Sequence, residues 1–239
     1  MTTVSDTCAL LQKGDVEVLG QLPYSSNYVF LARVCGSGLD ALVVYKPTRG
    51  ERPLWDFRTG SLAARERAAF LVSEAVGWGF VPPTVLRRNA PMGEGSLQLF
   101  VEHDPERHYL VLMQERIEDF ASFAAFDVVI NNADRKSGHI LEDAQGRLWG
   151  VDHGVCFNAH PKLRTVIWAF ADQRLKAPER DKLAALEEQL SQSDGLGGEL
   201  ARLLSARESA ATLARARSLL EEGRFPLPGD DRPLPWPLV

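Results

Sequence analysis

Two carboxylates, Asp134 and Asp152, lie on either side of a predicted hairpin, and this stretch constrains the fold more than any other. Asp134 stands in a polar loop that follows a long apolar segment. Residues 140–141 and 149–151 predict two short strands, and residues 143–146 predict the turn between them. A hairpin of that size holds both carboxylates at one end, facing one site. Such a pair suits a catalytic base and a metal ligand in phosphoryl transfer.

A lysine ends an apolar strand in the N-terminal part of the chain. Residues 29–34 and 41–46 predict a hairpin with a glycine-rich turn between its strands. Lys46 closes the second strand, and Pro47 stops further ladder pairing. Most lysines in this position point into solvent. The functional alternative is a lysine that holds ATP phosphates, and it requires a carboxylate partner.

Glu66 is the candidate for that partner. Residues 61–76 have a strong helical pattern, with Ser61 in the position of an N-cap. Glu66 shares the apolar face of this helix with Leu62 and Phe70. A carboxylate on such a face needs a cationic partner. The alternative is that the lysine and the glutamate are unrelated surface charges.

Other segments outline the domain organisation. Residues 102–108 are polar and rich in turn formers, so we expect a boundary between an N-terminal α+β lobe (1–104) and a helical C-terminal lobe (105–239). The patterns predict helices over 115–130, 162–170 and 179–190, and over 196–222 with breaks. A proline-rich, extended tail begins at Phe225.

Composition excludes several classes of function. The net charge of −5 implies no general affinity for nucleic acid or anionic membranes. No apolar run is long enough to span a bilayer, so integral membrane association is not expected. The N-terminus lacks the features of a signal peptide. Cys8, Cys35 and Cys156 are far apart and odd in number, which is typical of free thiols in a reducing cytoplasm.

Taken in order, these motifs resemble the catalytic fold of the phosphatidylinositol 3- and 4-kinases, within the protein-kinase-like superfamily. The type II phosphatidylinositol 4-kinases, with the compact actinobacterial chains grouped with them, are the branch that the chain resembles most. The resemblance is most specific at residues 131–135 and 151–157. It extends to Tyr45-Lys46-Pro47 and to residues 66–70 and 81–84, and less closely to residues 95–101. It implies a two-lobed fold with an N-terminal antiparallel sheet plus one helix and a mostly helical C-terminal lobe.

The resemblance also implies an ATP site. A loop of Ser25, Ser26 and Asn27, which by itself reads as an ordinary polar turn, would replace a glycine-rich loop over the phosphates. The residues implied near the hinge and the adenine are Phe100, Val101 and Glu102.

Four further residues acquire roles from the resemblance. Lys46 would contact the α- and β-phosphates, and Glu66 would orient it. Asp134 would accept the proton of the substrate hydroxyl or orient that hydroxyl, and Asp152 would bind Mg²⁺ that bridges the phosphates. These roles need oxygen ligands and fixed positive charge around the transferring group.

One position departs from the family pattern. The family has an asparagine five positions after the catalytic aspartate as a second metal ligand, and this chain has His139. Histidine matches Mg²⁺ poorly. Either His139 is a ligand and Mn²⁺ is preferred, or only one metal binds tightly, or activity is weak. A contact between a protonated ring and the substrate or a phosphate is a further alternative.

Three functions remain open at this point. The leading hypothesis is an ATP- and Mg²⁺- or Mn²⁺-dependent kinase that acts on a hydroxyl of a protein, a small molecule or an inositol lipid. The second is transfer of AMP from ATP bound in the opposite orientation. The third is a pseudokinase that binds nucleotide as a scaffold, an alternative that His139 supports and that the four residues Lys46, Glu66, Asp134 and Asp152 oppose.

Overall fold

The N-terminal part of the molecule is a five-stranded antiparallel sheet. A computed structural model describes residues 3–23 and 27–239 of the chain. The strands are β1 (Asp15–Gln21), β2 (Phe30–Gly36), β3 (Leu39–Pro47), β4 (Thr84–Arg87) and β5 (Gly95–Leu99). They lie in the order β1-β2-β3-β5-β4, so the predicted β2–β3 hairpin forms the middle of the sheet.

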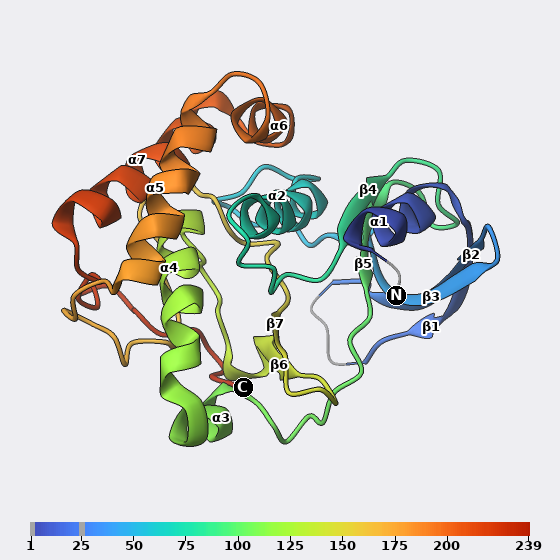
Figure 1. The fold of residues 1–239 in the computed structure, drawn as a ribbon. Coiled ribbons are helices and arrows are strands. Elements are labelled where there is room, and N and C mark those ends of the chain that lie inside the picture. The colour runs from blue at the N-terminus through green and yellow to red at the C-terminus, as the bar shows by residue number, and fades with distance from the viewer. Residues whose placement is uncertain (1–2, 24–26) are drawn as a thin grey trace.

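Helix α1 (Val4–Lys13) covers one face of this sheet (Figure 1). Leu10 and Leu11 pack in a small core with Val34, Tyr45 and Leu97 from the strands. The helix begins with a capping box, because Thr3 accepts the N–H of Asp6 and the Asp6 side chain accepts the N–H of Thr3.

Helix α2 (Leu62–Ala75) lies between the sheet and the C-terminal helices (Figure 1). Ser61 is the N-cap residue of this helix, as predicted, but its side chain does not cap the helix. Ser61 Oγ donates to the carbonyl of Arg58 instead. The carboxylate of Glu51, eleven residues before the helix, accepts the N–H groups of Leu62 and Ala63 at 3.1 and 3.2 Å.

The C-terminal part consists mostly of helices and contains one short hairpin. Its helices are α3 (Tyr109–Arg116), α4 (Ala121–Ile130), α5 (Ala177–Ser191), α6 (Leu196–Leu203) and α7 (Ala206–Glu222). The predicted hairpin is confirmed as β6 (Ile140–Glu142) and β7 (Leu148–Gly150). The predicted α+β architecture, an antiparallel sheet followed by a mostly helical part, is therefore confirmed.

Two predicted helices differ from the observed ones. The helix expected over 115–130 is divided into α3 and α4 by a 3-10 turn, Ile117–Phe120. The helix expected over 162–170 is absent, and the prediction is wrong. Thr165 instead forms a parallel bridge with Arg135, so this segment is held by pairing with a distant loop.

The largest core joins α2 to the C-terminal helices. The Phe80 ring stacks on Phe123 with centroids 4.0 Å apart and meets Phe126 edge-on at 5.0 Å. Phe70 and Val72 of α2 belong to the same buried cluster. Since α2 packs on both parts of the molecule, it sets the position of the sheet relative to the helices. The boundary at residue 104 stays a prediction.

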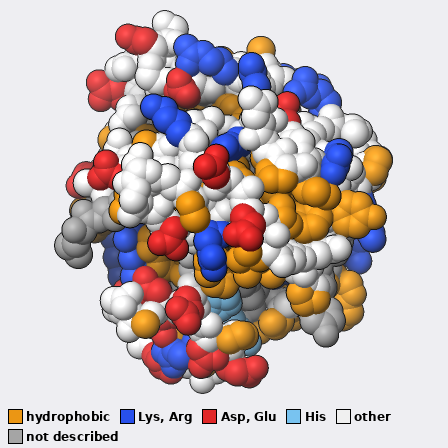
Figure 2. Space-filling model, turned by 90° about the vertical axis from the view of Figure 1, so that its right-hand side faces the viewer, with side chains coloured by type: hydrophobic (Ala, Val, Ile, Leu, Met, Phe, Trp, Pro, Cys, Tyr) orange, Lys and Arg blue, Asp and Glu red, His pale blue; other side chains and the backbone are white. Residues whose placement is uncertain are grey.

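The surface on the sheet side carries a patch of apolar side chains with acidic and basic side chains interspersed around it (Figure 2). In the described part of the chain, no helix combines the length and the apolar character needed to cross a membrane.

Candidate active site

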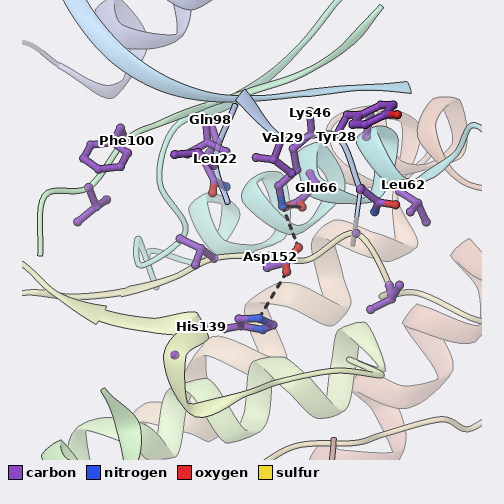
Figure 3. A pocket seen from close by; sticks show the side chains of 18 of the residues that line it. Leu22, Tyr28, Val29, Lys46, Leu62, Glu66, Gln98, Phe100, His139 and Asp152 are labelled. Atoms are coloured by element: carbon purple, nitrogen blue, oxygen red, sulfur yellow. Dashed lines mark hydrogen bonds and ion pairs between the residues drawn. The ribbon is translucent and has the colours of Figure 1, made fainter. Parts of the chain in front are cut away.

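A cavity of about 470 Å³ lies between the sheet and the β6–β7 hairpin. Its walls include side chains of β3, α2 and β5, and its floor includes the two loops that carry Asp134 and Asp152. Lys46 and Glu66 point from the sheet side toward Asp152, and His139 approaches Asp152 from the opposite side (Figure 3). The structure thus brings together the four predicted residues Lys46, Glu66, Asp134 and Asp152 around one cavity.

Lys46 connects three elements. Its ammonium group forms ion pairs with Glu66 Oε1 and, at 2.8 Å, with Asp152 Oδ1. Burial opposes the charged form, but the carboxylates of Asp152 and Glu66 outweigh it and raise the pKa of Lys46. The lysine therefore stays cationic over the whole physiological pH range.

Glu66 is buried and uses both carboxylate oxygens. Oε1 pairs with Lys46, and Oε2 accepts the backbone N–H of His153 at 3.0 Å. The carboxylate therefore links β3 to the loop of residues 152–154. An Asp at this position would be one methylene too short to keep both bonds.

Asp152 has the chemistry of a ligand for a hard divalent cation. Its backbone is left-handed, with φ of 61°, and its side chain is 52 % exposed toward the cavity. The nearby Lys46 charge lowers the pKa of Asp152 well below its ordinary value, so the side chain is an ionised oxygen donor. These features fit Mg²⁺ or Mn²⁺.

His139 lies beside Asp152, with its Nε2 3.4 Å from Asp152 Oδ2. Its Nδ1 accepts the N–H of Lys136 at 3.4 Å, which assigns the ring proton to Nε2, facing the carboxylate. Burial lowers the pKa of His139 to about 4, so the ring is neutral at pH 7. Metal ligation through Nε2 requires the opposite tautomer.

The described residues contain no group of three or more His, Cys, Asp or Glu side chains arranged to hold a metal ion. Asp152 and His139 are a pair, so a bound metal would take its remaining ligands from nucleotide phosphates and water.

Asp134 belongs to the Asp134 loop, residues 131–139. Its backbone N–H donates to Asn132 Oδ1 at 3.0 Å, and its carboxylate lies 3.5 Å from Lys136 Nζ. Burial raises the pKa of Asp134 to about 6, and the charges of Lys136 and Arg164 counteract part of that shift. The carboxylate is therefore mostly ionised at pH 7 but more basic than a free aspartate.

A buried ionic network supports this loop. Asp127 of α4 pairs with Arg135 at 2.9 Å, and both side chains are 0 % exposed. Asp127 also accepts from Asn132 Nδ2 at 3.0 Å and from Thr165 Oγ1 at 3.1 Å. Arg135 Nη2 lies 2.7 Å from His153 Nε2, so the network reaches the neighbouring loop. It holds the two loops in a fixed relation to each other.

Sequence reasoning missed this network. In the sequence, Asp127 is a single charge within an apolar helical segment, and a buried carboxylate needs a cationic or hydrogen-bonding partner. Arg135 follows Asp134 directly and was the available signal for that partner.

Two of the three residues expected near the adenine line the cavity. Phe100 and Val101 line it together with the apolar side chains of Val29, Val44 and Leu141. Glu102 is exposed and is not among the described lining residues.

On the expected phosphate-loop side, Asn27 lines the cavity and its Oδ1 accepts the N–H of Arg52 at 2.8 Å. Ser25 and Ser26 lie outside the described residues.

Comparison with known proteins tests the family. The family model described as phosphatidylinositol 3- and 4-kinase matches residues 67–180. Protein Rv2133c of Mycobacterium tuberculosis (strain ATCC 25618 / H37Rv) is 40% identical over 99% of this chain and 97% of its own length. Phosphatidylinositol 4-kinase gamma 4 of Oryza sativa subsp. japonica is 31% identical over 53% of this chain and 26% of its own length.

Solved structures show the same fold at low sequence identity. Hydra Fam20 with sugar has a TM-score of 0.61 at 15% identity, covering 92% of this chain and 88% of that chain. The Golgi casein kinase with Mn/ADP bound has a TM-score of 0.59 at 13% identity, covering 91% of this chain and 74% of that chain. The resemblance indicated by the motifs is confirmed: residues 67–180 match the phosphatidylinositol 3- and 4-kinase family model, and the chain has a protein-kinase-like fold.

Proposed function

We propose that the protein is an ATP- and divalent-metal-dependent kinase that transfers the γ-phosphate to a hydroxyl group. The observation that carries this proposal is the continuous chain of contacts from Glu66 through Lys46 to Asp152, in the same cavity as Asp134. Kinase-type phosphoryl transfer depends on positioning and on charge stabilisation, and this set of groups provides both.

In this proposal the nucleotide lies with its adenine between the apolar walls near Phe100 and Val101. Its phosphates extend toward Lys46, which contacts the α- and β-phosphates while Glu66 keeps it oriented. Asn27, which lines the cavity, and the preceding Ser25 and Ser26 are the residues proposed to bind the phosphates. Glu102 follows Val101 in the chain, and we propose that it contacts the nucleotide through its backbone.

Asp152 is the proposed metal ligand, and His139 is the candidate for a second ligand. A Mg²⁺ or Mn²⁺ ion held there would neutralise charge on the phosphate oxygens. Asp134 accepts the proton of the acceptor hydroxyl or orients that hydroxyl, and its ionised carboxylate at pH 7 suits either task. Lys136, 3.5 Å from Asp134, adds positive charge where the phosphoryl group would pass.

The proposed lobes are residues 1–104, which carry the nucleotide-phosphate groups, and residues 105–239, which carry the Asp134 and Asp152 loops. We also propose a reducing, cytoplasmic location, supported by Cys8, Cys35 and Cys156, all of which are free thiols.

The acceptor is a protein, a small molecule or an inositol lipid. The names of the relatives support two of these classes: the rice relative is called a phosphatidylinositol kinase and the Golgi neighbour a casein kinase. The chemistry of Asp134 is the same for each hydroxyl.

A paired labelling experiment tests the proposal. ATP labelled on the γ-phosphate and ATP labelled on the α-phosphate are each offered with Mg²⁺ or Mn²⁺ to the protein alone, to a soluble extract and to a lipid extract. We expect γ label in one fraction, and none with the Asp152→Ala variant. Transfer of α label would indicate AMP transfer instead. Bound ATP with no transfer of either label would indicate a pseudokinase.

A further inference from the structure

The tail, residues 224–239, leaves α7 and returns to the Asp134 loop. Its end lies beside β6 and α3, far along the molecule from the end of α7 (Figure 1). Phe225 anchors its beginning, since the ring is buried and the backbone N–H donates to Gln173 at 3.0 Å. The proline-rich segment that follows has few conformations to lose on ordering, so it can lie in one path at low entropic cost.

The tail makes its first contact near the loop through Pro233. The Pro233 carbonyl accepts two donors, the backbone N–H of Thr165 at 3.0 Å and Trp168 Nε1 at 3.1 Å. Thr165 is the residue that forms the parallel bridge with Arg135, directly after Asp134. Its hydroxyl also donates to Asp127 in the buried network. This contact therefore fixes the backbone of Thr165, which in turn pairs with the backbone of Arg135.

The second contact falls on the loop itself. The Leu238 carbonyl accepts the N–H of Ser137 at 2.8 Å, and Val239 packs beside Gly138. The Ser137 side chain is completely buried, and its Oγ accepts the N–H of Leu110 at 3.0 Å and bonds to His108 Nδ1 at 2.8 Å. Ser137 is thus held by α3 on one side and by the tail on the other.

We propose that residues 233–239 are a positioning segment that holds the backbone carrying Asp134. They hold this backbone at two points. One is Thr165, which pairs with Arg135, and the other is Ser137, in the turn that leads to His139. Fixing this backbone keeps the Asp134 carboxylate at the place where the acceptor hydroxyl must lie.

Two other roles for the tail fit the structure less well. The tail contains no Ser, Thr or Tyr, so it offers no side-chain hydroxyl as a phosphate acceptor. No tail residue is among the described residues that line the cavity, so the tail supports the loop from behind and does not block the site.

The experiment compares the full chain with a variant lacking residues 233–239. This proposal rests on the proposed kinase activity, so one readout is kinetic and a second is independent of turnover. The independent readout is amide hydrogen exchange of residues 135–139, because the Ser137 N–H has its acceptor in the tail. Leu227→Ala, a change at an exposed tail side chain outside 233–239, is the control.

We expect the deletion to lower kcat by roughly 10- to 100-fold, the range typical of a displaced catalytic group, with the KM for ATP within about twofold. Exchange at residues 135–139 should become faster, and a synthetic peptide of residues 233–239 added in trans should restore both properties. Leu227→Ala should behave as the full chain. If the larger deletion does not fold, removal of residues 238–239 alone tests the Ser137 contact.

A rise in kcat on deletion would overturn the proposal and indicate autoinhibition. Unchanged kcat with unchanged exchange would also overturn it. If the full chain shows no turnover, the proposed function fails, but the exchange measurement still decides on the tail: faster exchange supports its positioning role and unchanged exchange refutes it.

Discussion

At the scale of single residues, the surroundings of Lys46 favour its charged form, whereas those of Asp134 favour its neutral form. Two carboxylates surround Lys46 and keep it charged, whereas burial raises the pKa of Asp134 to about 6. A fixed cation and a tunable carboxylate are the two kinds of group that phosphoryl transfer to a hydroxyl requires.

Replacing Asp134 should separate nucleotide binding from turnover. Asp134→Asn keeps the size of the side chain but removes its basicity, so we expect kcat to fall by roughly 100- to 10,000-fold, as for loss of a general base. The Kd for nucleotide should change little. In the wild-type protein, kcat should fall as the pH drops through about 6, because protonation removes the base. Full activity of the Asn variant would rule out this role.

The metal preference tests His139. An amide oxygen is a harder ligand than an imidazole nitrogen, so His139→Asn should raise activity with Mg²⁺ relative to Mn²⁺ if residue 139 ligates the metal. The ratio of kcat with the two metals measures this directly. An unchanged ratio would indicate that the ring only lies beside Asp152, with His139 Nε2 3.4 Å from Asp152 Oδ2, and is not a metal ligand.

At the scale of elements, long-range ionic contacts tie the helices together. Arg65 of α2 is 2 % exposed, donates to the Cys156 carbonyl at 2.6 Å and pairs with Glu208 in the first turn of α7. Glu208 also completes a capping box with Ser205. The two residues are 143 positions apart in the sequence. The pair therefore fixes the position of α7 relative to α2, which the local sequence pattern of either helix does not predict.

Glu208→Ala should therefore destabilise the protein. It leaves the Arg65 guanidinium buried without its carboxylate, a loss of about 3 kcal/mol in the free energy of unfolding. Chemical denaturation at pH 7 measures the loss. Glu199→Ala, which breaks an exposed pair with Arg202, is the matched control and should cost less than about 1 kcal/mol.

The same contact predicts a pH dependence. Burial alone would raise the pKa of Glu208, but hydrogen bonds from Arg65 and Ser205 lower it below its ordinary value of 4.5. Its stabilising contribution is therefore complete above about 4.5 and is lost as the pH falls through the lower folded-state pKa. The stability difference between wild type and Glu208→Ala should shrink in that acidic range. A difference that stays constant down to pH 3 would contradict this assignment.

At the scale of the whole molecule, the cavity lies between the sheet and the helical part, with α2 packed on both. A nucleotide there would contact both parts at once and would bind only the folded state. Ligand at about 100 times its Kd should therefore add about 2.7 kcal/mol to the free energy of unfolding. A thermal shift with ATP and Mg²⁺ measures this, and Asp152→Ala should remove the metal-dependent part. Glu118→Ala, an exposed carboxylate outside the cavity, should retain the full shift.

The sequence by itself determined the local features. The strand that ends at Lys46, the helix that carries Glu66 and the hairpin between Asp134 and Asp152 all follow from the period of apolar residues and from turn formers. These signals act over a few residues, so they could be read without knowledge of the rest of the fold. The order of the motifs also indicated the family.

Only the tertiary structure decided the contacts between distant segments. The Glu51 cap on α2, the buried Asp127–Arg135 pair and the return of the tail to Ser137 join residues with no common period. The segment 162–170 has helical propensity, yet its backbone hydrogen bonds go to the Asp134 loop and the tail. A polar group that is buried away from water needs a hydrogen-bond partner inside the protein. The tertiary structure decides which distant segment supplies that partner.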